Sequence, residues 1–481
     1  MGMILYNIGR VDEAIDAYHQ AITIKPDLYT AWYNLGNALY RLQRYEEAVE
    51  AQRQAAVLAP NDHQIWSNLG AALVQAKRFQ EAVASYRRAV ALQPNHGETL
   101  ANLGAALRKL GQVDEVFDVF DRASQIMRGK RLLTAQLVPP DTLAGWTPVV
   151  AECRLIDAPA ESCVPAPLQC LPTYLLELRE AQVTANFLPL TAEGQIPRYG
   201  CSHCQLVELP DTAYSVYSEI VQIRDATAFL MPPAAIRRID QRCALFFGGN
   251  QTDYTHWLID YLGRLAVLSR FDDITRMPLL VGETLSDVQR AALARLGVPD
   301  GNLIYKRRDE YLHCRHLLAP SFASRTGIVY PEVVEFLRGN LAKGVAPSLC
   351  KRLYVSRRDT ARRKLVNEAE IEAYLAARGF SVILLGEMTL EQQISALAGA
   401  EVVVSATGSG LVNCAFCPPG ARMVEIITKP HAMPACLAAV GRLDYAAVVA
   451  QPVATTRPAA REDSTTYTVP LEQLAACLGP A

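Results

Sequence analysis

Residues 29–60 read YTAWYNLGNALYRLQRYEEAVEAQRQAAVLAP, and residues 63–94 repeat this pattern in register as HQIWSNLGAALVQAKRFQEAVASYRRAVALQP. The period is 34 residues, which is also the spacing of Pro26, Pro60 and Pro94. Apolar and small residues recur at helical spacing within each unit, and this predicts one helix pair per repeat. Because a single pair cannot bury its apolar face, we expect the pairs to stack into an array.

The positions shared by the repeats are apolar or small. The first full unit has Trp32, Leu35, Gly36, Ala48, Ala55 and Pro60, and the second has Trp66, Leu69, Gly70, Ala82, Tyr86, Ala89 and Pro94. A third unit keeps Leu103, Gly104, Phe120 and Ala123. Small residues let paired helices approach closely, and aromatic residues fill the space between neighbouring pairs. The pattern resembles the tetratricopeptide repeat (TPR) family over residues 1 to about 128.

The two ends of the array depart from the repeat. The repeat glycine of the first unit would be Gly2, so we expect that unit to be truncated. The last unit has Val116 and Arg128 where the others have Ala and Pro. The resemblance implies a concave surface for a peptide, a protein partner or an acceptor. An array that serves only as a spacer would show the same pattern.

Composition places the chain among ordinary globular proteins. Its 481 residues suggest two or three domains, and 47 basic against 49 acidic residues give a net charge of -2. No polybasic tract argues for nucleic acid or anionic lipid. No apolar run reaches the length of a membrane span or a signal segment, so we expect a cytoplasmic protein. The 12 cysteines all follow residue 150 and are expected to be free thiols.

The helical period stops after Gly129, and seven prolines punctuate the chain as far as Pro172. This passage marks a domain junction. We predict four segments: repeats over 1–131, a proline-rich junction over 132–172, an N-terminal lobe over 173–340 and a C-terminal lobe over 341–481.

Beyond the junction, short apolar runs alternate with helical patterns, which is typical of βα units in a parallel sheet. In the C-terminal part we expect strands at 353–356, 380–385, 401–405 and 422–427. Asn367 should cap a helix that ends at Gly379, and Thr389 with Gln392 should form a capping box. In the N-terminal part we expect strands at 244–247, 278–282 and 303–305, with helices at 255–271 and 285–297.

Two such halves form the layout of a GT-B glycosyltransferase, in which a cleft separates two Rossmann-like lobes. The predicted fold class is therefore α plus α/β, with a TPR array followed by a GT-B region. Two tandem dehydrogenase-like domains would show the same alternation. However, Gly408-Ser409-Gly410 continues into Leu411-Val412-Asn413 and completes no Gly-x-Gly-x-x-Gly fingerprint, which disfavours a dinucleotide site.

A basic segment follows the strand predicted at 353–356. Arg357, Arg363 and Asn367 lie between the end of that strand and the start of the next helix, where open α/β sheets bind their ligands. Cations and helix N–H groups there offset the charge of a diphosphate without a metal. A solvated basic loop would have the same composition.

A second candidate loop, Thr407-Gly408-Ser409-Gly410, follows the strand at 401–405. Its glycines permit close approach of the backbone to an anion, and the valines before it suit a buried parallel strand. The sequence therefore predicts a second anion-binding loop at the same edge of the sheet.

His256 and Asp260 are the candidate acid–base pair. They are four residues apart, so they share one face of a helix, and the carboxylate can orient the imidazole as a general base. A histidine that only packs the start of the helix is the alternative interpretation.

Three sets of residues together resemble glycosyltransferase family 61. They are His256-Trp257-Leu258 with Asp260, Tyr354-Val355-Ser356-Arg357 with Arg363 and Asn367, and Gly408-Ser409-Gly410-Leu411-Val412-Asn413 with Phe416-Cys417-Pro418-Pro419-Gly420. The resemblance covers roughly residues 240–430. It implies a metal-independent, inverting GT-B enzyme that takes a sugar such as xylose or N-acetylglucosamine from a nucleotide donor.

The resemblance also implies roles for these residues. Those implied for the diphosphate are Arg357, Arg363, Asn367 and the turn from Gly408 to Asn413. Glu425 would accept from the ribose, and His256 or Asp260 would face the acceptor hydroxyl. Thr407 is a departure, because the family commonly has His there. A hydroxyl donates only one neutral hydrogen bond, so activity could be reduced, altered in donor choice, or absent.

Two cysteine pairs have metal-ligand spacing, Cys201-x-x-Cys204 with His203 and Cys414-x-x-Cys417. The second pair lies beside the predicted turn, and the first has no matching pair nearby. His313 and His316 lie in a predicted strand, where residues three apart point to opposite faces. We expect no metal and no cofactor.

The leading hypothesis is a glycosyltransferase of polysaccharide biosynthesis that uses a nucleotide sugar and a glycan or protein acceptor, with a protein partner on the repeats. Nucleic acid and membrane spans are not expected. One alternative is an enzyme of the O-linked N-acetylglucosamine transferase type, which also joins such repeats to a GT-B region. The other is a repeat scaffold whose transferase domain no longer catalyses.

Overall fold

The computed structural model describes residues 1–110, 112–129, 131–150, 154–156, 168–170, 173–184, 187–197, 220–224, 227–247, 254–307, 310–322, 324–325, 328–358, 364–428, 432–453 and 466–478. The chain divides into two compact units. The first comprises Met1–Leu137 and Glu208–Ala234, and the second comprises Val138–Val207 and Ala235–Ala481.

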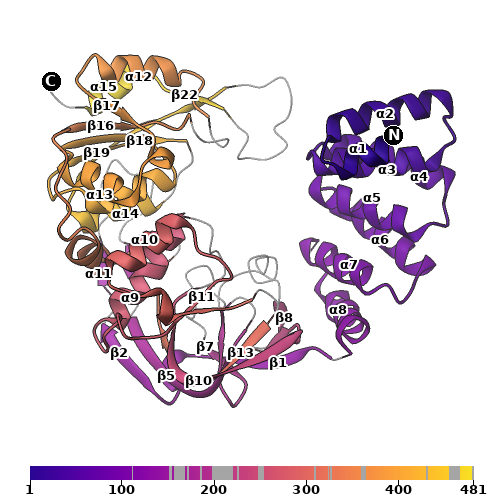
Figure 1. Cartoon of the computed structure of the whole chain (residues 1–481), viewed down its shortest axis with the longest axis horizontal. Helices are drawn as coiled ribbons and strands as arrows, with labels where there is room; N and C mark the ends of the chain where they lie inside the picture. The colour runs from indigo at the N-terminus through magenta and orange to yellow at the C-terminus, as the bar shows by residue number, and fades with distance from the viewer. Residues whose placement is uncertain are drawn as a thin grey trace. The chain divides into compact units, whose positions relative to one another are not determined.

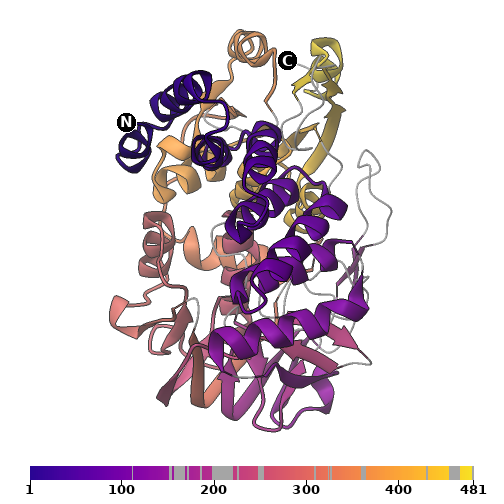
Figure 2. The ribbon, with the colours of Figure 1, turned by 90° about the vertical axis from the view of Figure 1, so that its right-hand side faces the viewer.

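Helices that pack in successive pairs make up most of the first unit (Figures 1 and 2). They are α1 (Gly2–Asn7), α2 (Val11–Ile24), α3 (Tyr29–Arg41), α4 (Tyr45–Leu58), α5 (His63–Gln75), α6 (Phe79–Leu92), α7 (Gly97–Lys109) and α8 (Val113–Arg128). The predicted helical array is confirmed. Its first helix is only six residues long, so the first pair is the short one.

Close approach within each pair depends on glycine. An ideal Cβ on Gly70 would lie 2.7 Å from the ring of Tyr86, and one on Gly104 would lie 2.6 Å from the ring of Phe120. Both distances are shorter than carbon atoms tolerate. The small residues of the repeat therefore make room for the aromatic residue of the partner helix.

Tryptophan and proline, which define the period in the sequence, contact each other. The indole N–H of Trp66 donates to the carbonyl of Pro60 at 2.9 Å, and Trp32 makes the same bond one repeat earlier. In the last unit Arg122 donates to the carbonyl of Pro94 at 2.6 Å. A side chain thus ties each interrepeat loop to a helix.

Three strands complete the first unit: β1 (Leu133–Val138), β8 (Ile220–Arg224) and β9 (Thr227–Leu230). Strand β9 pairs antiparallel with both β1 and β8. The ring of Phe229 packs edge-on against that of Phe117 in α8, 4.9 Å between centroids. The predicted N-terminal lobe includes the residues of β8 and β9, but the structure places both strands in the unit of the repeats. The reason is that β1, which follows α8 along the chain, pairs with β9.

The second unit holds two large sheets, and the two-stranded sheets among its described residues are small additions to them (Figure 1). The first has the strands β2 (Trp146–Val150), β5 (Thr173–Val183), β6 (Pro189–Leu190), β10 (Ala235–Leu245), β11 (Leu279–Val281), β12 (Leu303–Tyr305) and β13 (Glu310–Pro320). Its order is β12-β11-β10-β13-β5-β2. Strands β10 to β13 run parallel, and β5 pairs antiparallel with β13 and β2. Strand β2 lies within the predicted junction, which therefore contributes to this sheet.

The connections of this sheet are η3 (His256–Tyr261, one π-helical segment), α9 (Leu262–Leu268) and α10 (Asp287–Arg295). A capping box of Ser286 and Gln289 starts α10. Thus β10, β11 and β12 alternate with helices as the sequence predicts.

The second sheet is parallel throughout. Its strands are β16 (Arg352–Val355), β17 (Ser381–Ile383), β18 (Val402–Ala406), β19 (Arg422–Ile427) and β20 (Asp444–Val449), in the order β17-β16-β18-β19-β20. Its connections are α12 (Glu368–Ala376), η6 (Leu385–Glu387), α13 (Leu390–Gly399), η7 (Ser409–Phe416) and α14 (Ala432–Gly441). This is the doubly wound order 2-1-3-4-5.

Two predicted helix starts in this sheet have different outcomes. The capping box of Thr389 and Gln392 is present at α13. Asn367 is the N-cap residue of α12, as predicted, but its side chain makes no cap hydrogen bond. Its side-chain amide instead donates to the carbonyl of Val469 at 2.9 Å and accepts from the backbone N–H of Val469 at 3.0 Å.

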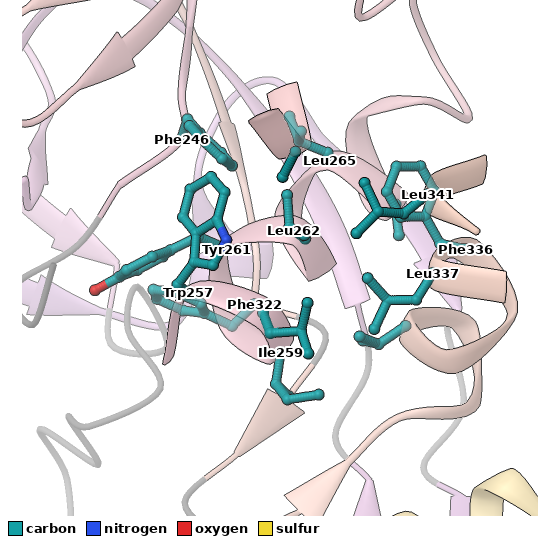
Figure 3. Close-up of a cluster of buried hydrophobic side chains, with 14 of the residues drawn as sticks. Phe246, Trp257, Ile259, Tyr261, Leu262, Leu265, Phe322, Phe336, Leu337 and Leu341 are labelled. Carbon is teal, nitrogen blue, oxygen red and sulfur yellow. The ribbon is translucent and has the colours of Figure 1, made fainter. Parts of the chain in front are cut away.

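One apolar core extends through both sheets of the second unit. Figure 3 shows part of this core, where the rings of Trp257 in η3 and Phe246 pack edge-on, 5.5 Å between centroids; it also shows Leu337 and Leu341 of η5 (Leu337–Leu341). Trp257 is 1% exposed. The helix that carries the predicted acid–base pair is therefore fixed by deep burial of its other face. The remaining elements are η1 (Pro140–Thr142), β3 (Arg154–Ile156), β4 (Leu168–Cys170), β7 (Gln195–Pro197), η4 (Asp300–Asn302), β14 (Ser324–Arg325), β15 (Ile328–Val329), α11 (Pro331–Phe336), β21 (Gln451–Pro452), β22 (Tyr467–Thr468) and α15 (Leu471–Cys477).

The turns inside the helix pairs yield a stability prediction. Gln43 and Lys77 have φ of 61°, and Gly9 has φ of 85° one repeat earlier. A left-handed conformation costs a non-glycine residue about 1–2 kcal/mol, more than the entropy that glycine loses. Lys77→Gly should raise the unfolding free energy of the array by about 0.5–1 kcal/mol. Urea denaturation followed by circular dichroism measures it.

The matched control is Ala76→Gly, because Ala76 has an ordinary φ of -75°. That change should lower the stability by about 0.5–1 kcal/mol. Equal effects of the two substitutions would contradict the explanation.

Candidate active site

Strands β16 and β18 lie side by side in the second sheet. The chain continues from β16 to β17 on one side of this pair, and from β18 to β19 on the other side. Ligands of open α/β sheets bind in the crevice beyond the carboxyl ends of two such strands. The segments that emerge there are Ser356–Arg358 after β16 and Thr407–Gly410 after β18. These are the two loops that the sequence singles out.

Arg357 and the turn at Gly408 are in contact. The guanidinium Nη1 of Arg357 donates to the carbonyl of Thr407 at 3.3 Å. An ideal Cβ on Gly408 would lie 2.0 Å from that same nitrogen. A side chain at position 408 would therefore displace the guanidinium, and glycine lets the cation lie directly on the backbone of the turn.

Glu368, in the first turn of α12, holds the end of β16. Its carboxylate accepts from the backbone N–H of Arg357 at 3.0 Å, and from the hydroxyls of Ser356 and Tyr354 at 2.8 Å each. These bonds fix the backbone from which Arg357 projects. Sequence reasoning missed Glu368, although a carboxylate at a helix start beside a basic strand end is a usable signal.

The other two predicted partners of the diphosphate are not brought to this contact. Arg363 lies outside the described residues. The amide of Asn367 is bonded to Val469, 102 residues further along the chain. The structure therefore gives Asn367 the role of tying the C-terminal strand segment to the start of α12.

Thr407 and Glu425 bind one another. The hydroxyl of Thr407 donates to one oxygen of Glu425 at 2.6 Å, and the hydroxyl of Tyr445 donates to the other at 2.6 Å. Glu425 is 2% exposed and Thr407 is 4% exposed. Burial raises the pKa of Glu425, against the two hydroxyl hydrogen bonds. The side chain at position 407 thus points into the sheet layer.

His256 and Asp260 pair as the sequence predicts. The Nδ1 nitrogen of His256 lies 2.6 Å from a carboxylate oxygen of Asp260, across one turn of η3. The imidazole is 21% exposed and the carboxylate 8%. A proton held on Nδ1 by the carboxylate makes Nε2 the basic nitrogen of the ring.

Tyr254, two residues before His256, connects this helix with the second sheet. Its hydroxyl lies 2.8 Å from the side-chain oxygen of Asn413 in η7 and 3.1 Å from that of Gln393 in α13. Asn413 is 1% exposed. The structure thus brings the segments at 254–260 and 408–413 together. Asn413 contacts Tyr254 there, and neither Tyr254 nor Gln393 carries a motif that sequence reasoning could have used.

The candidate metal ligands have other partners. Cys414 and Cys417 are buried in and beside η7, and a mutual hydrogen bond together with burial raises the pKa of Cys414. His313 and His316 lie 2.8 Å from Glu180 and Glu177 respectively. Over the described residues, no cluster of three or more His, Cys, Asp or Glu side chains has the arrangement of a metal site.

Cys201, His203 and Cys204 lie outside the described residues. Within the part of the chain that the structure describes, no helix is both long and apolar enough to cross a bilayer.

Repeats joined to a doubly wound α/β unit define the class of this protein. Residues 254–424 match the family model described as Glycosyltransferase 61. Residues 1–158 match the model described as the C-terminal domain of cilia and flagella-associated protein 70, a TPR region. The predicted fusion of tetratricopeptide repeats with a glycosyltransferase 61 domain is confirmed. No curated protein matches the chain.

Solved structures match over about a quarter of the chain. "MamA MSR-1 C2" is 26% identical, over 26% of this chain and 72% of that one, with a TM-score of 0.25. "MamA 41-end from Desulfovibrio magneticus RS-1" is 21% identical, over 27% and 73%, with a TM-score of 0.26. "Crystal structure of YrrB: a TPR protein with an unusual peptide-binding site" is 24% identical, over 27% and 66%, with a TM-score of 0.26.

The buried carboxyl of Glu425 makes stability depend on pH. Its pKa is raised by burial above the ordinary 4.5, so the folded state keeps a proton that the unfolded state releases. Its contribution to stability is therefore full below pH 4.5 and is lost as the pH rises through the raised pKa.

Glu425→Gln removes this titration. Relative to the unaltered protein, the unfolding free energy of the variant should increase as the pH rises from 4.5 upward. Urea denaturation at a series of pH values measures the difference. A difference that is flat or that falls with pH would contradict the assignment.

Proposed function

We propose that the chain transfers a sugar from a nucleotide-sugar donor to a hydroxyl of a glycan or protein acceptor. The observation that carries the proposal is the convergence of Arg357 and the Gly408 turn at the switch point of a parallel sheet, inside a glycosyltransferase 61 match. The TPR array, proposed over 1–131, recruits a protein partner or the acceptor, and the junction spans 132–172.

The proposed arrangement is GT-B, with two Rossmann-like lobes. The lobe over 173–340 serves the acceptor and the lobe over 341–481 serves the donor. The strand orders of the two sheets support this arrangement. In β12-β11-β10-β13 and in β17-β16-β18-β19-β20, the side on which successive strands are added changes once, as it does in nucleotide-binding sheets.

At the donor end, Arg357 neutralises the diphosphate together with Arg363. The backbone N–H groups of Gly408, Ser409 and Gly410, at the start of η7, add hydrogen bonds. As the bond between the anomeric carbon and the phosphate oxygen breaks, this cation and these dipoles stabilise the negative charge of the leaving nucleoside diphosphate. The charge on Arg357 takes the place of a metal ion.

At the acceptor end, Nε2 of His256 takes the proton of the acceptor hydroxyl. The oxygen attacks the anomeric carbon on the face opposite the leaving group, so the configuration inverts. Asp260 holds the other nitrogen at 2.6 Å and balances the imidazolium charge that forms.

A second candidate function is a repeat scaffold with an inactive transferase domain. It is favoured by the contact of Thr407 with Glu425, because both groups are turned inward and bonded to each other at 2.6 Å. In that case the donor receives no help from either side chain. The two candidates differ in whether the protein binds and consumes a nucleotide sugar.

Arg357→Ala tests the proposal. We expect a loss of about a hundredfold or more in transfer, because one preorganised group that stabilises the leaving charge is removed. Calorimetric titration with UDP, UDP-xylose and UDP-N-acetylglucosamine should show weaker binding as well. The control is Arg378→Ala, since Arg378 stacks on Tyr374 after α12, away from the switch point. Unchanged turnover in Arg357→Ala overturns the proposal, and an unaltered protein that binds none of the three ligands supports the scaffold.

Metal removal gives an independent test of the donor end. Transfer measured after dialysis against EDTA should equal transfer in the presence of added Mg²⁺ or Mn²⁺, because Arg357 supplies the positive charge. Activity that requires re-addition of a divalent cation would contradict this part of the proposal.

A further inference from the structure

The hydroxyl of Tyr254 contacts two side chains that are themselves bonded to loops of the second sheet. Two amide oxygens face it, from Asn413 at 2.8 Å and from Gln393 at 3.1 Å. Both belong to helices that follow strands of the second sheet, whereas Tyr254 lies at the start of the helical stretch of the first sheet that carries His256. One phenol thus contacts two elements of the neighbouring sheet.

The orientation of both amides is set by what their nitrogens hold. The Nε2 of Gln393 donates to the carbonyls of Leu385 at 2.9 Å and Met388 at 3.2 Å, in the loop after β17. The Nδ2 of Asn413 donates to the carbonyl of Gly410 at 3.4 Å, in the turn after β18. Their oxygens are therefore left to face Tyr254. Through them the phenol reaches the loops on either side of Arg357.

Tyr254 cannot move far without moving His256. Only one residue separates them, and the helix that begins at this point is anchored by Trp257, whose ring lies in the shared core at 1% exposure (Figure 3). Any shift of the phenol relative to Asn413 is therefore a shift of the imidazole relative to the Gly408 turn. Positional errors of about 1 Å cost about a hundredfold in rate.

We propose that Tyr254 is a positioning residue that sets the register between the His256 base and the donor loops, because its one hydroxyl hydrogen is shared between the amide oxygens of Asn413 and Gln393. This inference rests on the proposed function. The phenol transfers no proton in this role, and burial raises the pKa of Tyr254 so that it stays a donor. Apolar packing alone would not need the hydroxyl, so phenylalanine separates the two roles.

The test compares Tyr254→Phe with Tyr305→Phe in the full chain. Tyr305→Phe also removes one hydroxyl bond, the one that Tyr305 accepts from Arg290 at 2.9 Å, but this bond connects only elements of the first sheet and its helices. In Tyr254→Phe we expect faster amide hydrogen exchange over residues 385–388 and 409–416, measured by mass spectrometry. We expect kcat to fall by about ten- to a hundredfold, with an unchanged pH profile. Tyr305→Phe should change none of these.

The outcomes separate this inference from the proposed function. Exchange that is equal in Tyr254→Phe and the unaltered protein overturns the inference, and so does faster exchange with unchanged kcat. A shifted pH profile would mean that the phenol takes part in proton transfer, which also overturns it. If the unaltered protein transfers no sugar, the proposed function fails, and the exchange measurement alone then decides whether Tyr254 holds the two loops.

As a second variant, Asn413→Ala combined with Tyr254→Phe should cost less in kcat than the sum of the two single changes, because the bond between Tyr254 and Asn413 is lost in both. Additive losses would show that the two residues act separately, and would overturn the inference.

Discussion

The contact between Arg357 and the backbone at Gly408 depends on the pairing of two parallel strands. Residues that follow neighbouring strands emerge at one edge, so a cation after β16 meets a glycine turn after β18 without any further device. The absence of a Cβ at Gly408 then lets Nη1 lie on the turn. Everything else near this edge either fixes the two strands or brings a third element to them.

Two carboxyl groups hold the strands in place, the half-buried Glu368 and the buried Glu425. Glu368 collects three hydrogen bonds at the end of β16, and Glu425 collects two between β18, β19 and β20. A buried carboxyl group such as that of Glu425 is costly unless its oxygens are hydrogen-bonded. Thr407 therefore belongs to the framework of the site, and a histidine at that position would have to displace this arrangement or point elsewhere.

Sequence predicts those features that depend on neighbours along the chain. The 34-residue period predicts the helix pairs, and apolar runs predict β11, β12, β16, β17, β18 and β19 to within two residues at each end. Only the end of β10 is predicted, because its first half is rich in charged residues, and no range is predicted for β2, β5, β6, β13 or β20. Arg357 and the Gly408 turn could be paired in advance because each follows a buried strand. Asn367 and Asn413 could not be placed, because their partners, Val469 and Tyr254, lie 102 and 159 residues away. No local pattern records such bonds.

The two sheets of the second unit share one apolar core, yet the core alone does not align their chemistry. Apolar burial is roughly proportional to area and has no direction, so Trp257 and its neighbours hold η3 in place without specifying the register of His256 against a loop. Hydrogen bonds have direction and a narrow range of length. The 2.8 Å bond from Tyr254 to Asn413 supplies what the core lacks, because it defines where η3 begins relative to η7. Because the alignment depends on one hydroxyl, the loss of that single oxygen atom removes the alignment while the core remains packed.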